Sequence, residues 1–179
     1  LAIPATLVSN DPLQVQAFCR EQQAVVAKML HSFAIFQDDK EHVVFTSEVT
    51  ASQIDDALRL CPMVFQQKIN KARELRVTVV GDQCFCIALH SQRFAGAEVD
   101  WRRQGLQLVD SWQIEELPAQ VQQQCISVCR ALSLNYGAID IIVDQDGRYV
   151  FLEVNPSGEF YWAEQFNQLG ITGALADLF

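Results

Sequence analysis

Three oxygen-bearing side chains toward the C-terminus, Asp140, Glu153 and Asn155, could together bind a divalent metal ion. They flank Asp146-Gly147, a dipeptide typical of a two-residue type I′ hairpin turn, in which both central residues need positive φ. Mg²⁺ prefers carboxylate and amide oxygens and leaves its remaining positions to water or phosphate oxygens. The chemistry that these residue types could support is therefore the binding of a Mg²⁺–nucleotide.

The register that such a turn sets would place two carboxylates directly opposite each other. Counting outward from the turn, the predicted cross-strand pairs are Gln145–Arg148, Val143–Val150, Ile141–Leu152 and Asp140–Glu153. Like charges in opposition destabilise a sheet, and a cation between them removes the conflict. Asn155 shares a face with Glu153, two residues away. An ordinary hairpin with an exposed acidic pair fits the spacing equally well, whereas a glycosidase pair would need a sugar cleft that nothing here indicates.

The elements that must position these side chains alternate between helix and strand patterns. Asn10-Asp11-Pro12 predicts the start of a helix over 12–21, Thr50 with Gln53 a capping box, and Pro118 the start of a long helix. Strands are predicted at 24–30, 42–46, 63–69, 75–80, 84–90, 137–143 and 148–155, with a loop over 93–108 and a helical tail. This order favours an α+β fold with mixed or antiparallel sheets, and no Rossmann or Walker A motif occurs.

The composition limits the classes of function. With 179 residues, 50% of them hydrophobic, the chain can bury a core, and a net charge of −9 argues against nucleic-acid binding. No apolar run reaches the roughly 20 residues that span a bilayer, and no signal peptide is evident, so we expect no membrane association and a cytoplasmic location. The six cysteines favour free, buried thiols in a reducing compartment; Cys125 and Cys129 lie one helical turn apart, but the histidines that could complete a zinc site are scattered.

The segment Phe151–Gly158, following Gly137–Asp140, resembles the metal-binding segment of ATP-grasp ligases. More narrowly, it resembles the microviridin-type (graspetide) peptide maturases and their relative, the ribosomal-protein glutamate ligase. Further similar segments lie at 3–12, 65–69, 74–81 and 99–102, so the resemblance spans almost the entire chain. It implies an ATP-grasp fold with a small lobe (1–65), a large lobe (66–179) and a nucleotide cleft between them. An N-terminal domain that normally closes this cleft has no counterpart before Leu1, so we expect a fragment and do not assume turnover by this chain alone.

The resemblance also implies roles for single residues. It assigns Lys28 to the ATP phosphates, the backbone of Gln67 and Lys68 to adenine, Glu74 to the ribose hydroxyls, Arg76 to the phosphates or acyl phosphate, and Arg102 to phosphate or substrate. Each role has an alternative. Lys28 could be an ordinary lysine of an edge strand, and Glu74 and Arg76 could form a surface ion pair. Arg102 could belong to an ordinary charged loop. Ser91-Gln92 resembles a rim segment of the active site, and the predicted phosphate-covering loop between Leu30 and Val43 lacks glycine.

The implied activity is ATP- and Mg²⁺-dependent ligation, in which the γ-phosphoryl group passes to a carboxylate and a hydroxyl or amine attacks the acyl phosphate. In graspetide maturation both partners are side chains of a precursor peptide, and the product is an ester or amide macrocycle. A ligase that adds glutamate-type amino acids to a protein tail or small molecule, and a non-catalytic module that binds nucleotide or peptide, remain alternatives. The resemblance leaves room for a homodimer.

Overall fold

The computed structural model describes residues 1–30, 34–38 and 40–178, which fall into two compact units. Unit 1 comprises residues 1–3, 70–95 and 104–179, and unit 2 comprises residues 4–69 and 96–103. The predicted lobes, 1–65 and 66–179, stay a prediction, because compact units need not coincide with the lobes of a ligase. Within the described ranges, none of the helices combines the length and the apolar character needed to cross a membrane.

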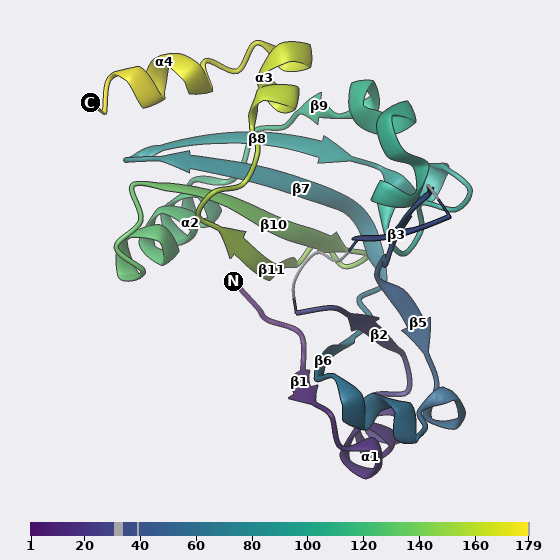
Figure 1. Cartoon of the computed structure of the whole chain (residues 1–179). Helices are drawn as coiled ribbons and strands as arrows, with labels where there is room; N and C mark the ends of the chain where they lie inside the picture. The colour runs from purple at the N-terminus through teal and green to yellow at the C-terminus, as the bar shows by residue number, and fades with distance from the viewer. Residues whose placement is uncertain (31–33, 39, 179) are drawn as a thin grey trace. The chain divides into compact units, whose positions relative to one another are not determined.

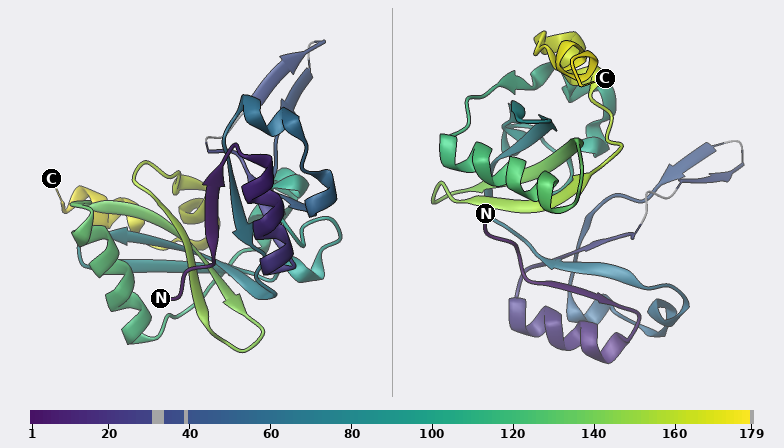
Figure 2. Two further views of the ribbon diagram at one scale, coloured as in Figure 1. Left: turned by 90° about the horizontal axis from the view of Figure 1, so that it is seen from below. Right: turned by 90° about the vertical axis from the view of Figure 1, so that its left-hand side faces the viewer.

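Unit 2 is built on an antiparallel sheet with the strand order β1-β6-β2-β5. Its elements are β1 (Thr6–Ser9), α1 (Pro12–Gln22), β2 (Val25–Lys28), β3 (Ala34–Gln37), β4 (Lys40–Val43), β5 (Ser47–Val49), η1 (Ala51–Gln53), η2 (Asp56–Leu60) and β6 (Met63–Gln67), where η marks a 3₁₀ helix. Helix α1 lies along one face of the sheet (Figure 2), where Val15 and Cys19 pack on Val25, Ala27 and Phe65. Burial of this apolar stripe holds β2, and therefore Lys28, in a fixed register.

The start of α1 follows its sequence signal, but its end does not. Asp11 caps the helix by accepting a hydrogen bond from the Leu13 N–H at 3.0 Å, as the Asp-Pro signal predicts. At the other end Gln23 has φ 64° and ψ −50°, and the Ala24 N–H donates to the Gln22 carbonyl at 2.7 Å. These values define a γ-turn of the strained, rare hand, which reverses the chain into β2 within one residue.

Unit 1 is an antiparallel sheet with helices on both faces (Figure 1) and the strand order β11-β10-β7-β8-β9. Its elements are β7 (Lys71–Val80), β8 (Gln83–Leu89), η3 (Ser91–Arg93), β9 (Gln113–Ile114), α2 (Ala119–Ala131), β10 (Tyr136–Asp144), β11 (Tyr149–Asn155), α3 (Tyr161–Asn167) and α4 (Ile171–Ala176), with η4 (Trp101–Ser111) crossing from unit 2. One face packs on α2 through odd-numbered residues of β7 and β10, among them Val77 and Ile139. The other face meets α4 at Val80 and leaves the even-numbered positions nearer residue 140 for polar side chains.

The β10–β11 hairpin keeps the predicted Asp140–Glu153 pair but not the predicted turn. The Gly147 N–H donates to the Asp144 carbonyl at 3.1 Å, and Gly147 has φ 80° whereas Asp146 is not in the positive-φ region, so the type I′ turn was wrong. The observed pairs near the turn are Val143–Tyr149, Ile142–Val150 and Ile141–Phe151, so the predicted pairs Val143–Val150 and Ile141–Leu152 were also wrong. A bulge with Leu152 as the extra residue shifts the register back and restores the opposition of the two carboxylates.

Two other expectations of local structure were wrong. Of the strand expected over 42–46, only His42 and Val43 lie in a strand, at the end of β4, and residues 44–46 connect β4 to β5. The Thr46 N–H donates at 3.0 Å to the Asp100 carboxylate and not to a neighbouring strand. The loop expected over 93–108 begins at the last residue of η3 and contains most of η4. Part of the segment between Leu30 and Val43, residues 31–33 and 39, lies outside the described residues.

Replacing Gln23 by glycine should stabilise the protein, because glycine adopts positive φ without the steric cost that a side chain incurs. We expect the free energy of unfolding to rise by about 1 kcal/mol. Ala17→Gly is the matched control: Ala17 is exposed inside α1, so this variant should lose about 1 kcal/mol. Urea unfolding of both variants measures the difference; a loss of stability in Gln23→Gly would contradict the assignment of strain.

Candidate functional site

A row of three charged side chains crosses the middle of the unit 1 sheet. Arg76 on β7 lies opposite Asp140 on β10, which lies opposite Glu153 on β11. The Arg76 Nε lies 3.2 Å from the Asp140 Oδ1, and the two side chains are 18% and 34% exposed. Among the described residues no cation forms an ion pair with Glu153, which is exposed. Arg76 therefore compensates one of the two opposed carboxylates and leaves one negative charge over.

Asn155 completes this face, and the turn after it is tightly built. The Asn155 Oδ1 accepts hydrogen bonds from the Ser157 N–H at 2.9 Å and the Ser157 hydroxyl at 3.3 Å. Gly158 is buried directly above Ala138, since a Cβ at Gly158 would lie 2.5 Å from the Ala138 Cβ and 3.4 Å from the Arg76 Nη1. The Tyr136 hydroxyl donates to the Gly158 carbonyl. The chain thus returns over the sheet next to the charged row.

Glu74 is held by a lysine that the sequence analysis did not single out. The Lys71 Nζ lies 2.7 Å from the Glu74 Oε1, with only 5% and 16% of the two side chains exposed. Lys71 also joins β7 to the hairpin turn, because its carbonyl accepts a hydrogen bond from the Gln145 amide at 2.9 Å. The surface pair Glu74–Arg76 considered above is wrong, since Glu74 pairs with Lys71 and Arg76 with Asp140. The missed signal was the Lys-x-x-Glu spacing at the start of a strand that begins at Lys71 rather than at Leu75.

The remaining residues predicted to bind nucleotide lie in unit 2. Lys28 is partly buried at the end of β2, opposite Val64 on β6. The Gln67 and Lys68 N–H groups donate to the carbonyls of Ala5 and Ala24, each at 2.9 Å. A base held by the backbone of Gln67 and Lys68 would therefore meet carbonyl oxygens and not these N–H groups.

Arg102 makes a two-pronged ion pair within its own loop. Its Nε and Nη2 lie 2.8 and 2.9 Å from the two oxygens of Asp100, and 57% of the arginine side chain remains exposed. Burial alone would raise the pKa of Asp100, but the hydrogen bonds and charge of Arg102 and the Thr46 N–H outweigh it and lower this pKa. The Arg103 Nη2 donates at 3.0 Å to the Thr46 carbonyl. The loop around Arg102 is thus anchored to the segment before β5.

The cysteines offer no competing site. All six are free, as expected, although Cys61 is exposed and Cys84 only partly buried. Burial raises the pKa of Cys84 to about 11 and that of Cys125 to about 12, so both thiols stay protonated at neutral pH and are poor nucleophiles and metal ligands.

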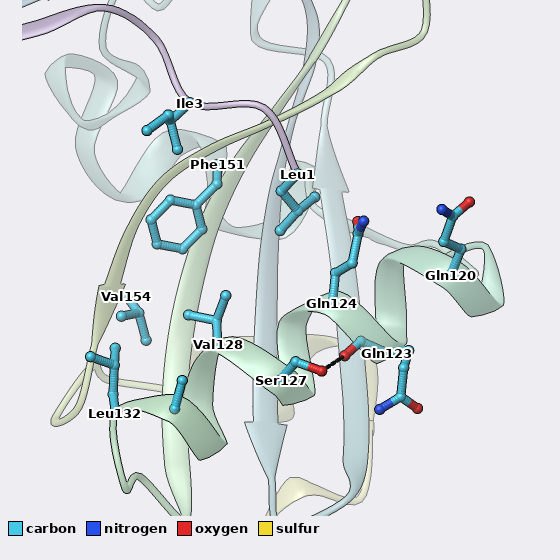
Figure 3. A pocket seen from close by; sticks show the side chains of 11 residues that line it. Leu1, Ile3, Gln120, Gln123, Gln124, Ser127, Val128, Leu132, Phe151 and Val154 are labelled. Atoms are coloured by element: carbon cyan, nitrogen blue, oxygen red, sulfur yellow. Dashed lines mark hydrogen bonds between the residues drawn. The ribbon is translucent and has the colours of Figure 1, made fainter.

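A broad apolar groove in unit 1 can also be set apart from the site (Figure 3). It has a volume of about 920 Å³ and is lined by Leu1, Ile3, Gln120, Gln123, Gln124, Ser127, Val128, Ala131, Leu132, Phe151 and Val154. None of these side chains is charged, and Val154 points to the α2 side of the sheet while its neighbours Glu153 and Asn155 are exposed. A triphosphate needs cations, so this groove does not suit one.

The charged row fits one hard cation bound with a phosphate ligand. In the described part of the chain no three His, Cys, Asp or Glu residues form a closed metal cluster. Asp140, Glu153 and Asn155 supply two carboxylates and one amide on one face, which is too few for a site made by protein alone. Mg²⁺ usually takes one or two carboxylates together with phosphate and water, so this donor set suits it.

Comparisons with known proteins show a family for the chain as a whole. A model of the RimK-like ATP-grasp domain matches residues 1–178. The chain belongs to this family. A comparison with curated protein sequences gives no match.

Solved structures support the ATP-grasp fold over the whole chain. A RiPP-associated ATP-grasp ligase of Chryseobacterium gregarium, solved with ADP and a leader and core peptide, shares 40% identity at a TM-score of 0.94. The macrocyclase MdnC of Microcystis aeruginosa MRC, bound with the precursor peptide MdnA, shares 42% identity at a TM-score of 0.83. The chain is covered to 99% in each case and spans 54% of each relative. The ATP-grasp ligase PsnB, at 23% identity and a TM-score of 0.76, shares the fold.

Removing the Lys71 charge should leave Glu74 as a poorly solvated carboxylate. We expect Lys71→Met to lower the free energy of unfolding by about 3 kcal/mol, because breaking a buried ion pair costs more than deleting it whole. The double variant Lys71→Met/Glu74→Gln should recover a clear part of that loss. Equal losses in the single and double variants, measured by urea unfolding, would show that the pair itself is unimportant.

The lowered pKa of Asp100 predicts acid sensitivity. Since the folded-state pKa lies below the unfolded value of about 3.9, its stabilisation is complete above that pH and is lost as the pH falls toward the folded-state value. Asp100→Asn should therefore flatten the fall in unfolding free energy below about pH 5, whereas the exposed Asp110→Asn should not. The same acid slope in wild type and Asp100→Asn would contradict this.

Proposed function

We propose that this chain is the nucleotide-binding part of an ATP- and Mg²⁺-dependent ligase that closes side-chain ester or amide macrocycles in a ribosomally made precursor peptide. The observation that carries the proposal is the row Arg76–Asp140–Glu153 with Asn155 beside it, in a chain of the RimK-like ATP-grasp family. The two relatives at 40% and 42% identity, one a RiPP-associated ligase and one a macrocyclase, each bound to peptide, support the substrate class.

The residues have distinct roles in this proposal. Asp140, Glu153 and Asn155 would hold Mg²⁺, which when bound neutralises charge on the phosphate oxygens. Arg76 fixes Asp140 from one side, and its remaining N–H groups would stabilise the negative charge of the acyl phosphate. Glu74, oriented by Lys71, would accept hydrogen bonds from the ribose hydroxyls. These contacts position the reactants more than they perform covalent chemistry, as phosphoryl transfer requires.

Four residues of unit 2 also have proposed roles, which come from the family resemblance. Lys28 would contact the phosphates, the backbone of Gln67 and Lys68 the adenine, and Arg102 the phosphate or the substrate. Arg102 already pairs with Asp100, as Arg76 does with Asp140, so each guanidinium would use its remaining N–H groups.

An amino-acid ligase of the glutamate type remains the second candidate, because the matching family model is the RimK-like one. The two functions differ in the mass of their products. Co-expression with a precursor peptide should give a loss of about one water per ring for macrocyclisation and a gain of an amino-acid residue for the alternative. The chain spans 54% of its relatives, so co-expression uses it together with any sequence that its gene encodes beyond residues 1–179.

Nucleotide binding by the chain itself is the direct test. We expect ATP to bind in a Mg²⁺-dependent way, and Glu153→Ala to weaken that binding on the order of 10-fold or more, in the range seen for lost metal contacts. Lys28→Ala should weaken it even without Mg²⁺, since the lysine meets the phosphates directly. Glu159→Ala, an exposed acid outside the charged row, is the matched control. Isothermal titration calorimetry measures the affinities. ATP binding that is unaffected by the metal and by both substitutions would refute the proposal. A chain that binds the precursor peptide but no ATP would refute it too.

A further inference from the structure

Three successive positions on one face of β10 form a connected group. Tyr136, Ala138 and Asp140 are two residues apart and therefore project from the same side of the sheet. Gly158 lies over the middle position, since a Cβ on it would approach the Ala138 Cβ to 2.5 Å. On one side the Gly158 carbonyl accepts the hydrogen bond of the Tyr136 hydroxyl. On the other side lies the charged row.

Gly158 limits the space open to Arg76. The Arg76 Nη1 would lie 3.4 Å from a Cβ at Gly158, and its Nε lies 3.2 Å from the Asp140 Oδ1. The guanidinium is therefore confined between a backbone segment and a carboxylate, and only 18% of the side chain is exposed. The Asn155 Cβ, 3.3 Å from the same position, is confined by the same segment. Both side chains thus depend on where the backbone of Gly158 lies.

The hydrogen bond from Tyr136 is well placed to fix that backbone. The tyrosine ring packs against a buried cluster of Val80, Ile171 and Ala174, together with Phe160, so the position of its hydroxyl is set by packing that includes α4. Its ring centroid lies 6.1 Å from that of Phe160. A hydroxyl held by packing presents its hydrogen bond with little loss of entropy, which is the property expected of a residue that positions others.

We propose that Tyr136 is a positioning residue for the charged row: by holding the Gly158 carbonyl, it keeps the backbone of Gly158 over Ala138 and so confines Arg76 and Asn155 beside Asp140 and Glu153. This inference rests on the proposed function only in that the group bound by the charged row is a divalent metal with a nucleotide. It also explains why position 158 is glycine, since any side chain there would displace Ala138, Asn155 or Arg76.

The variant Tyr136→Phe removes the hydroxyl and keeps the ring in its cluster. In the metal-free chain, the Nε–H signal of Arg76, assigned by its loss in Arg76→Lys, should exchange with water several-fold faster than in wild type. In the presence of ADP, Mn²⁺ should bind about 10-fold more weakly, as is typical when a residue behind the metal ligands is removed. Tyr161→Phe, at a tyrosine that is 68% exposed, should change neither.

A second variant tests the space above Ala138 without depending on the tyrosine. Gly158→Ala is combined with Ala138→Gly, which removes the nearest clash and leaves the contacts to Asn155 and Arg76. This double variant should also speed the exchange of the Arg76 Nε–H and weaken Mn²⁺ binding.

Wild-type exchange of the Arg76 Nε–H in both variants would overturn the inference. Failure of the wild-type chain to bind Mn²⁺ with ADP would count against the proposed function instead, while the exchange rate in the metal-free chain still decides the role of Tyr136.

Discussion

The enforced closeness of Asp140 and Glu153 is the constraint on which the site depends. Two carboxylates opposite each other repel, yet the apolar face of the sheet behind them, buried against α2, fixes both strands in that register. Arg76 compensates one of the charges. The remaining charge and the amide of Asn155 give the row the oxygen donors that, in the proposed function, would bind a hard cation.

Around this row, the surrounding elements mainly hold side chains in place. Lys71 orients Glu74 from a buried position, and the Tyr136–Gly158 hydrogen bond closes the space beside Arg76. In unit 2, Asp100 forms an ion pair with Arg102 and accepts a hydrogen bond from the Thr46 N–H, just before β5. Each of these contacts is an ion pair or a hydrogen bond with at least one partly buried partner, and such contacts are stronger than those in bulk water. Such preorganisation suits phosphoryl transfer, whose catalysis consists largely of positioning and charge stabilisation.

The sequence predicted the parts of the fold that local chemistry determines. The cap at Asp11, the helix after Pro118 and the Asp140–Glu153 pair all follow from short patterns. The Asp140–Glu153 pair was predicted correctly although the predicted type I′ turn was wrong. The observed turn shifts the register by one residue, and the bulge at Leu152 shifts it back by one residue. Thr46 could not be placed, since its hydrogen-bond partner Asp100 is distant in sequence. Lys71 was missed although its ion pair with Glu74 is local, because the strand was expected to begin only at Leu75. The roles of Lys28, Gln67, Lys68 and Arg102 came from family resemblance and stay predictions.

The stability of Glu153→Gln, measured with and without Mg²⁺ and ADP, tests whether Asp140 and Glu153 share a cation. Removing one of two opposed charges should raise the free energy of unfolding of the metal-free chain, by up to about 1 kcal/mol as for a cross-strand pair. With Mg²⁺ and ADP present the sign should reverse, because the wild type gains binding energy that the variant lacks. A substitution whose effect on stability is the same in both conditions would contradict the account, because the two carboxylates would then share no cation.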